Sequence, residues 1–311
     1  MFLSTVKRIH PWFFSGLCIV TLFASSLTSS AAPAIWLLAV TAALGAPHGA
    51  LDLVVAYRAG LFDNYRQTLA FFATYLALAG LTALLWVTAP ALALSAFLAL
   101  SAWHFGADWP SLRRELRFLA GAAVVSLPAV SHQPAVADIF AVLVHNDPDS
   151  GRQIAAALHA LGHLGIVAAL LVAARNVRKR LDVSLELASV TAVGLLLEPL
   201  AYFALYFCAL HGLRHTLVAV SCCEVSVGRV ILWTAGALVA VTAVAFVGLY
   251  QFSNAHLEVG LLLVVFIGLS TLTVPHVALM TYRERVVKLP SRSARSAMGA
   301  GRVVPLRAPS H

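Results

Sequence analysis

The sequence predicts an all-α fold: a polytopic membrane helical bundle of about eight to ten transmembrane helices, with N-terminus and C-terminus cytoplasmic. Hydrophobic residues make up 60% of the 311 residues, charged residues only 11%, and the mean hydropathy is +0.88. Soluble domains rarely have this composition, and the apolar runs repeatedly approach the ~20 residues that a bilayer crossing requires. We therefore expect a multi-pass protein of the cell (inner) membrane.

Ten apolar segments follow one another when the chain is divided at its polar, glycine and proline residues. They are residues 12–29, 33–57, 68–88, 91–107, 114–130, 153–174, 183–198, 199–220, 230–250 and 258–281. The fourth and seventh are short enough to be tilted or re-entrant, and only Glu198-Pro199 separates the seventh from the eighth. The segments form one transmembrane domain over residues 1–288. Residues 289–311 are rich in Ser, Arg, Pro and Gly and are expected to be a disordered basic tail.

The basic residues set the expected orientation, because cytoplasmic loops are enriched in Lys and Arg. With ten crossings and the N-terminus inside, only Arg152 faces outside, and Arg214 lies within a helix. The net charge of +8 then belongs to short loops, which argues against a nucleic-acid partner. Lys7-Arg8 and the apolar run after it imitate a signal peptide, but we expect an uncleaved first helix. The four cysteines lack C-x-x-C spacing and imply no disulfide framework.

Five histidines lie inside apolar runs, where an unpaired polar ring is costly. They are His48, His104, His211, His215 and His276. Counted back from the cytoplasmic ends of their helices, all five fall at one depth in the membrane. His211 and His215, at i and i+4, project from one helical face and could bind one ion together. We predict metal ligation by His48, His104, His211 and His215, with His276 as an additional ligand or a pocket residue.

Two aspartates each follow one of these histidines by four residues. Asp52 follows His48, and Asp108 follows His104. On a continuous helix this spacing places the acid one turn from the ring. We expect Asp52 to accept the spare ring N–H of a ligating histidine and to fix its tautomer. Asp108 could do the same, or it could mark a solvated helix end.

Small and helix-bending residues flank the same histidines. Pro47 and Pro275 precede two of them and are expected to kink their helices, which opens space for a substrate. Gly49, Gly106 and Gly212 leave room for a bulky ligand or for close helix packing. Both roles are open for each glycine.

Five further histidines are expected to lie away from the centre. His159 and His163 also have i, i+4 spacing, but they lie nearer the outer end of their segment. His132, His145 and His256 fall in expected outside loops and are predicted to be solvated.

Four motifs carry a resemblance to a known family. They are Pro47-His48-Gly49-Ala50-Leu51-Asp52, His104-Phe105-Gly106 with Asp108, Tyr206-Phe207 leading into His211-x-x-Arg214-His215, and Thr273-Val274-Pro275-His276. In these motifs and their order the chain resembles the Brp/Blh-type β-carotene 15,15′-dioxygenases of bacteria and archaea. These are integral membrane enzymes that supply retinal to microbial rhodopsins.

The resemblance implies a non-haem Fe(II) centre whose ligands stand at His48, His104, His211 and His215. Two positions of an octahedral ion remain for O2, which is added across the central double bond of β-carotene to give two molecules of retinal. The domain 1–288 is then catalytic, and its partners are a carotenoid, O2, the lipid bilayer and, through retinal, a microbial rhodopsin. The pocket residues that the motifs suggest are Phe105, Tyr206 and Phe207, beside Gly49, Gly106 and Gly212.

The chain also departs from the family's pattern near one ligand. Phe207-Cys208-Ala209-Leu210 precedes His211 where an aromatic residue is expected closer to it, and Gly212 stands where serine is common. These departures bear on the substrate rather than on the iron. Two other functions stay open at this point: electron transfer through haem b with axial histidines, and a histidine-based metal transporter.

Overall fold

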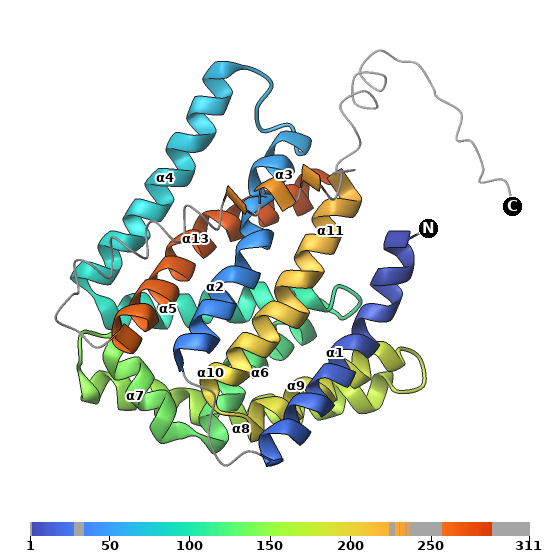
Figure 1. The fold of residues 1–311 in the computed structure, drawn as a ribbon, viewed down its shortest axis with the longest axis vertical. Coiled ribbons are helices and arrows are strands. Elements are labelled where there is room, and N and C mark those ends of the chain that lie inside the picture. The colour runs from blue at the N-terminus through green and yellow to red at the C-terminus, as the bar shows by residue number, and fades with distance from the viewer. Residues whose placement is uncertain are drawn as a thin grey trace, which may run out of the picture.

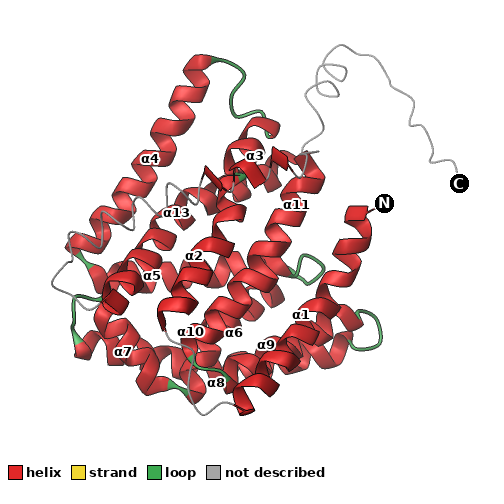
Figure 2. Ribbon diagram, viewed as in Figure 1, coloured by secondary structure: helices red, strands yellow, loops and turns green. Residues whose placement is uncertain are grey.

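The computed structural model describes residues 2–27, 34–223, 228–229, 231–233, 235–236 and 257–287. The described elements are all helices, and no strand occurs in these ranges (Figures 1 and 2). The predicted all-α class is therefore confirmed. Most of the ninth predicted segment, 230–250, and the whole predicted tail, 289–311, lie outside the described residues.

The helices follow the predicted segments closely elsewhere. In chain order they are α1 (Phe2–Leu27), α2 (Ala34–Ala50), α3 (Asp52–Arg58), α4 (Tyr65–Thr88), α5 (Pro90–Phe105), the 3-10 turn η1 (Gly106–Asp108), α6 (Arg114–Ser131), α7 (Gln133–Leu143), α8 (Pro148–Asn176), α9 (Leu181–Leu196), α10 (Pro199–Leu205), the π-helical η2 (Tyr206–Gly212), α11 (Leu213–Cys223) and α13 (Leu257–Val287). Side-chain hydrogen bonds explain where two of these helices begin. Asn64 accepts a hydrogen bond from the Gln67 backbone N–H at the start of α4, and Asp147 caps α8 in the same way, just before Pro148.

Five described stretches are long and apolar enough to cross a membrane. They are Ile9–Leu27, Tyr65–Thr88, Pro90–Asp108, Pro148–Asn176 and Leu257–Arg283. The larger count of eight to ten crossings and the cytoplasmic location of both termini stay predictions. In Figure 1, α2 and α11 run through the middle of the bundle, whereas α4 stands at its edge, and few residues of α4 are buried.

The sequence predicted an outside loop between the fifth and sixth segments. This prediction was wrong in one respect, because the region contains the helix α7. α7 has 11 residues, about 16 Å at the usual rise, which is too short for a hydrocarbon core of about 30 Å. Its buried residues include Val136, Phe140 and Leu143, and it packs on α8. A short apolar helix with a proline in its first turn lacks the length by which hydropathy indicates a membrane crossing, so its sequence resembles that of a loop.

Two predicted continuous helices are interrupted, each between a histidine and its following aspartate. The helix expected over 33–57 is divided at Leu51 into α2 and α3. α5 ends at Phe105, and Asp108 lies in the 3-10 turn η1. The i, i+4 geometry that the sequence suggested for these His–Asp pairs therefore does not hold along a single α-helix.

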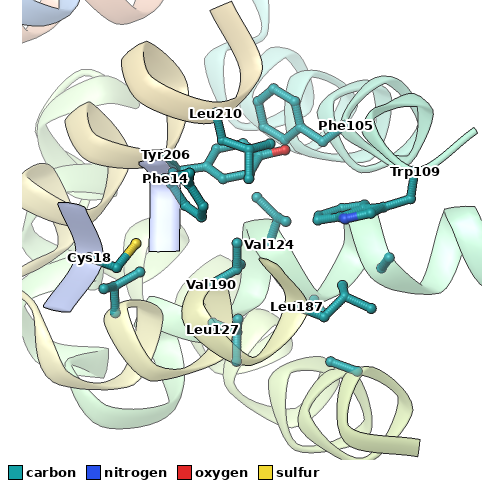
Figure 3. Close-up of a cluster of buried hydrophobic side chains, with 14 of the residues drawn as sticks. Phe14, Cys18, Phe105, Trp109, Val124, Leu127, Leu187, Val190, Tyr206 and Leu210 are labelled. Atoms are coloured by element: carbon teal, nitrogen blue, oxygen red, sulfur yellow. The ribbon is translucent and has the colours of Figure 1, made fainter. Parts of the chain in front are cut away.

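The largest core cluster packs α1, α6, α9, α10 and η2 around buried aliphatic and aromatic side chains, drawn in Figure 3. Its centre includes Phe14, Val124, Leu127, Val190 and Leu210. The same cluster contains Phe105 and Tyr206, whose ring centroids are 5.1 Å apart. The core therefore extends to the residues next to the candidate ligands.

Close backbone approach depends on glycine where α6 meets α5 and η1. A Cβ atom at Gly121 would lie 1.9 Å from the Ala102 carbonyl oxygen and 2.6 Å from the Gly106 nitrogen. A Cβ atom at Gly106 would lie 2.5 Å from the Arg117 carbonyl oxygen. The end of α5, which carries His104, is thus held directly against the backbone of α6.

We predict that Gly121→Ala destabilises the protein by about 1–3 kcal/mol, because α5 and α6 must separate to admit the methyl group. The measurement is the thermal unfolding midpoint in detergent. Gly80→Ala in α4 is the control, since a Cβ atom there meets nothing within 4 Å. Equal midpoints for the two variants would contradict the close contact.

Candidate metal centre

Three histidines from α5, η2 and α11 meet inside the bundle. His104 is in the last turn of α5, His211 in η2 and His215 in the first turn of α11. A π-helical turn inserted in a helix often marks a functional site, because it re-aims the side chains that follow it. Here the helical run from α10 to α11 keeps His211 and His215 on one face, with ring centroids 4.5 Å apart.

The geometry of these three imidazoles fits a single ion. One ring nitrogen from each of His104, His211 and His215 lies within 4.8 Å of the other two. The ring of His104 is 4.7 Å from that of His211 and 5.1 Å from that of His215, measured between centroids. His104 and His211 are buried, and His215 is partly buried. Neutral imidazoles gathered in this way are typical ligands of a transition metal.

Asp108 holds the ring of His211 in place. Its Oδ2 atom is 3.1 Å from His211 Nδ1 and accepts a hydrogen bond of 2.6 Å from the Tyr206 hydroxyl. With Nδ1 donating to the carboxylate, Nε2 of His211 is the atom that can bind a metal. Asp108 was expected to accept a hydrogen bond from His104, but its histidine partner is His211. The 3-10 turn after Phe105 is the reason.

A buried charge pair supports Asp108 from the other side. Arg214 donates to the main-chain carbonyl of Asp108 and also to Glu186 Oε1. Trp109 Nε1 donates to Glu186 Oε2 at 3.0 Å. His10, on α1, lies 3.4 Å from the Arg214 guanidinium through its Nδ1 and contacts the Ala209 carbonyl through Nε2.

Glu186, Trp109 and His10 were not among the residues that the sequence singled out. For Glu186 there was a usable signal, because a carboxylate inside the apolar segment 183–198 needs a partner. Arg214 is likewise a charge inside a predicted helix, but other charges such as Asp52 also lie in predicted segments, so the sequence did not indicate which of them would pair.

A second aspartate–histidine pair lies beside the cluster. Asp52 Oδ1 is 2.7 Å from His276 Nδ1, and Asp52 Oδ2 accepts a hydrogen bond of 2.9 Å from the Tyr75 hydroxyl. The ring centroid of His276 is 5.1 Å from that of His104 and 5.8 Å from that of His215. Asp52 was expected to accept from His48, whose side chain lies outside the described residues.

The histidines predicted to lie away from the centre are apart from it where they are described. His159 Nδ1 contacts the Ala129 carbonyl, and His163 Nδ1 contacts the His159 carbonyl, each at 2.9 Å. His145 is exposed, as expected. His132, expected to be solvated, is half-buried between α6 and α7, and His256 lies outside the described residues.

An apolar cavity adjoins the cluster. It is bordered by residues of α5, α6, α7, α10, η2 and α13, and it has a volume of about 100 Å³. Phe105 and Tyr206 belong to its lining, and their ring centroids are 4.8 and 6.3 Å from that of His211. The cavity therefore reaches the side chains that touch the candidate ligands.

The remaining pocket candidates have different surroundings. Phe207 stacks on His211 with centroids 5.7 Å apart, although it is not part of this cavity's lining. Gly106 faces the α6 backbone, so its small size serves helix packing. Gly212 is buried, whereas a Cβ atom at Gly49 would meet nothing within 4 Å.

We predict that Glu186→Gln lowers the free energy of unfolding by about 3 kcal/mol, because it leaves the Arg214 guanidinium without its anionic partner. This is the lower end of the range for buried pairs, since the Arg214 side chain keeps 19% exposure. Denaturant or thermal unfolding in detergent measures it. The control is Glu115→Gln, whose carboxylate is 74% exposed beside Arg113. A loss no larger than that of the control would contradict the supporting role of the pair.

Comparison with known proteins shows the family of the chain. The family model described as beta-carotene 15,15′-dioxygenase matches residues 39–282. A protein named beta-carotene 15,15′-dioxygenase from uncultured marine bacterium 66A03 is 28% identical over 255 residues, which cover 79% of this chain and 92% of that protein. No solved structure matches the chain. Because the family match covers most of the chain and includes every candidate ligand, the chain belongs to the beta-carotene 15,15′-dioxygenase family of enzymes.

Proposed function

We propose that this protein is an Fe(II)-dependent dioxygenase that cleaves the central double bond of β-carotene to two molecules of retinal. The observation that carries the proposal is the meeting of three imidazoles, from His104, His211 and His215, within 4.8 Å inside an apolar bundle. The family resemblance adds His48 as the fourth ligand. The name of the marine relative supports the substrate.

The donor set suits iron. The three described ligands are all imidazoles, and the nearby carboxylate of Asp108 is hydrogen-bonded to His211. Imidazole binds Fe, Zn and Cu, whereas Mg and Ca prefer oxygen ligands. Four histidines leave two positions of an octahedral ion. Bound Fe(II) supplies the activation of O2 that a closed-shell Zn²⁺ ion cannot supply.

The residues around the centre orient the ligands and receive the polyene. Asp108 keeps His211 in one tautomer, and Arg214 fixes the main chain of Asp108. Tyr206 gives its hydroxyl hydrogen to Asp108, so its ring can present an apolar surface to the cavity it shares with Phe105. In the overall reaction the substrate C=C bond is broken, and each carbon of it receives one oxygen atom of O2.

The proposed substrate and the apolar exterior of the protein both favour a lipid environment. A carotenoid dissolves in lipid, and five helices are apolar and long enough to cross a bilayer. We place the enzyme in the cell membrane with the N-terminus inside, and the substrate enters from the bilayer. Retinal released there would be available to a microbial rhodopsin.

A haem b group fits this site less well than a single metal ion does. Axial ligands of a haem stand on opposite sides of a macrocycle. Here three imidazole nitrogens lie within 4.8 Å of one another. This arrangement favours a single ion with several histidine ligands. Metal transport, the other open reading, predicts no oxygen-dependent aldehyde product.

We predict retinal formation in bacterial cells that accumulate β-carotene and express the chain. His104→Ala and His211→Ala should each reduce retinal by at least about 100-fold, because each removes a ligand. Chromatography of the extracted pigments gives both substrate loss and product. His163→Ala is the matched control, an exposed histidine on α8 that should keep full activity. Retinal formation that survives in both ligand variants would reject the proposed centre.

Removal of the metal should abolish cleavage by the purified protein. After treatment with a chelator, Fe(II) is expected to restore retinal formation and Zn²⁺ is not, because only iron activates O2 here. Retinal quantified per iron bound is the measurement. Restoration by Zn²⁺ alone, or a Soret absorption band in the active protein, would contradict a non-haem iron centre.

A further inference from the structure

Two chains of hydrogen bonds with the same residue types flank the histidine cluster. One runs from Tyr206 through Asp108 to His211, and the other from Tyr75 through Asp52 to His276. We propose that His276 is a ligand of the metal centre, and that Asp52 and Tyr75 are its positioning residues. This inference rests on the proposed function, since it presumes that the cluster binds a metal.

The first chain shows what such an arrangement does. Asp108 shares one oxygen, Oδ2, between the Tyr206 hydroxyl at 2.6 Å and His211 Nδ1 at 3.1 Å. The tyrosine holds the carboxylate, and the carboxylate holds the imidazole. A carboxylate bonded to the non-ligating nitrogen is the usual companion of a metal-bound histidine.

The second chain repeats this order with residues from three other helices. Tyr75 is on α4, Asp52 in the first turn of α3 and His276 on α13, so none of them shares a helix with the first chain. The Asp52 contacts measure 2.9 Å to Tyr75 and 2.7 Å to His276. Asp52 and His276 are both only 4% exposed. Burying a carboxylate is costly unless it is hydrogen-bonded, so the contacts with Tyr75 and His276 stabilise Asp52 in this orientation.

The environment of α3 keeps Asp52 in position. Leu51, Val55 and Ala56 are almost fully buried in a cluster that also includes Val220 of α11 and Leu279 of α13. The carboxylate at the start of α3 is therefore anchored to the helix that carries His276 and to the helix that carries His215. Tyr75 ties the largely exposed helix α4 to the same point.

The chemistry of the ring makes His276 suited to bind the ion. Its Nδ1 atom is engaged by Asp52, so Nε2 is the ligand atom that remains. Its centroid distance to His104, 5.1 Å, equals that between His104 and His215, two members of the three-histidine group. With His48 also bound, His276 takes one of the two positions left on an octahedral ion, and one remains for O2.

The test is the binding of Fe(II) and Co²⁺ to the purified full-length protein. His276→Ala is expected to weaken Fe(II) binding by at least about 10-fold and to change the visible absorption spectrum of the Co²⁺ form. Asp52→Asn should weaken binding about 10- to 100-fold, and Tyr75→Phe should have a smaller effect in the same direction. Tyr65→Phe, on the same helix as Tyr75 but 79% exposed, is the control and should change neither quantity.

The outcomes separate this inference from the proposed function. A folded His276→Ala protein with unchanged Fe(II) affinity and an unchanged Co²⁺ spectrum overturns the inference. If His104→Ala loses metal binding in the same experiment, the proposed function still stands. Metal binding that is equal in the parent and in His104→Ala instead rejects the proposed centre. If His276→Ala does not fold, unchanged Co²⁺ spectra in both Asp52→Asn and Tyr75→Phe overturn the inference.

Discussion

A buried carboxylate that accepts hydrogen bonds from a tyrosine and a histidine is the interaction on which the site depends. Asp108 is only 2% exposed, and the cost of burying its carboxylate is offset by Tyr206, His211 and the nearby guanidinium of Arg214. This arrangement requires η1, η2 and α11 to meet at one point. The tight packing of α5 against α6 and the π-helical turn are both parts of that requirement, because they bring His104 and His211 to the same place.

The site joins two environments that chemistry on a carotenoid would need. On one side lie buried polar groups that hold the histidine rings in place. On the other lies an apolar cavity that Phe105 and Tyr206 separate from them. Tyr206 belongs to both, since its hydroxyl serves Asp108 and its ring faces the apolar space. A single residue thus links ligand orientation to the wall of the pocket.

Much of this could be predicted from the sequence. Hydropathy predicted the all-α class and most helix positions, and the rarity of histidine in apolar runs indicated His104, His211 and His215 as partners. The sequence predicted each aspartate as the partner of a histidine, and for Asp108 that partner is His211 rather than His104. The difference depends on the 3-10 turn that begins at Gly106, where the close approach of α6 leaves no clear signal in hydropathy. The pairing of Glu186 with Arg214 and the role of Tyr75 likewise depend on contacts between distant segments.

X-ray absorption at the iron edge of the purified, active, full-length protein tests the central claim most directly. The account predicts a nearest shell of nitrogen and oxygen only, with the outer-shell scattering of at least four imidazole rings. A sulfur shell, a porphyrin pattern or scattering from no more than two imidazoles would contradict a polyhistidine centre at this point of the fold.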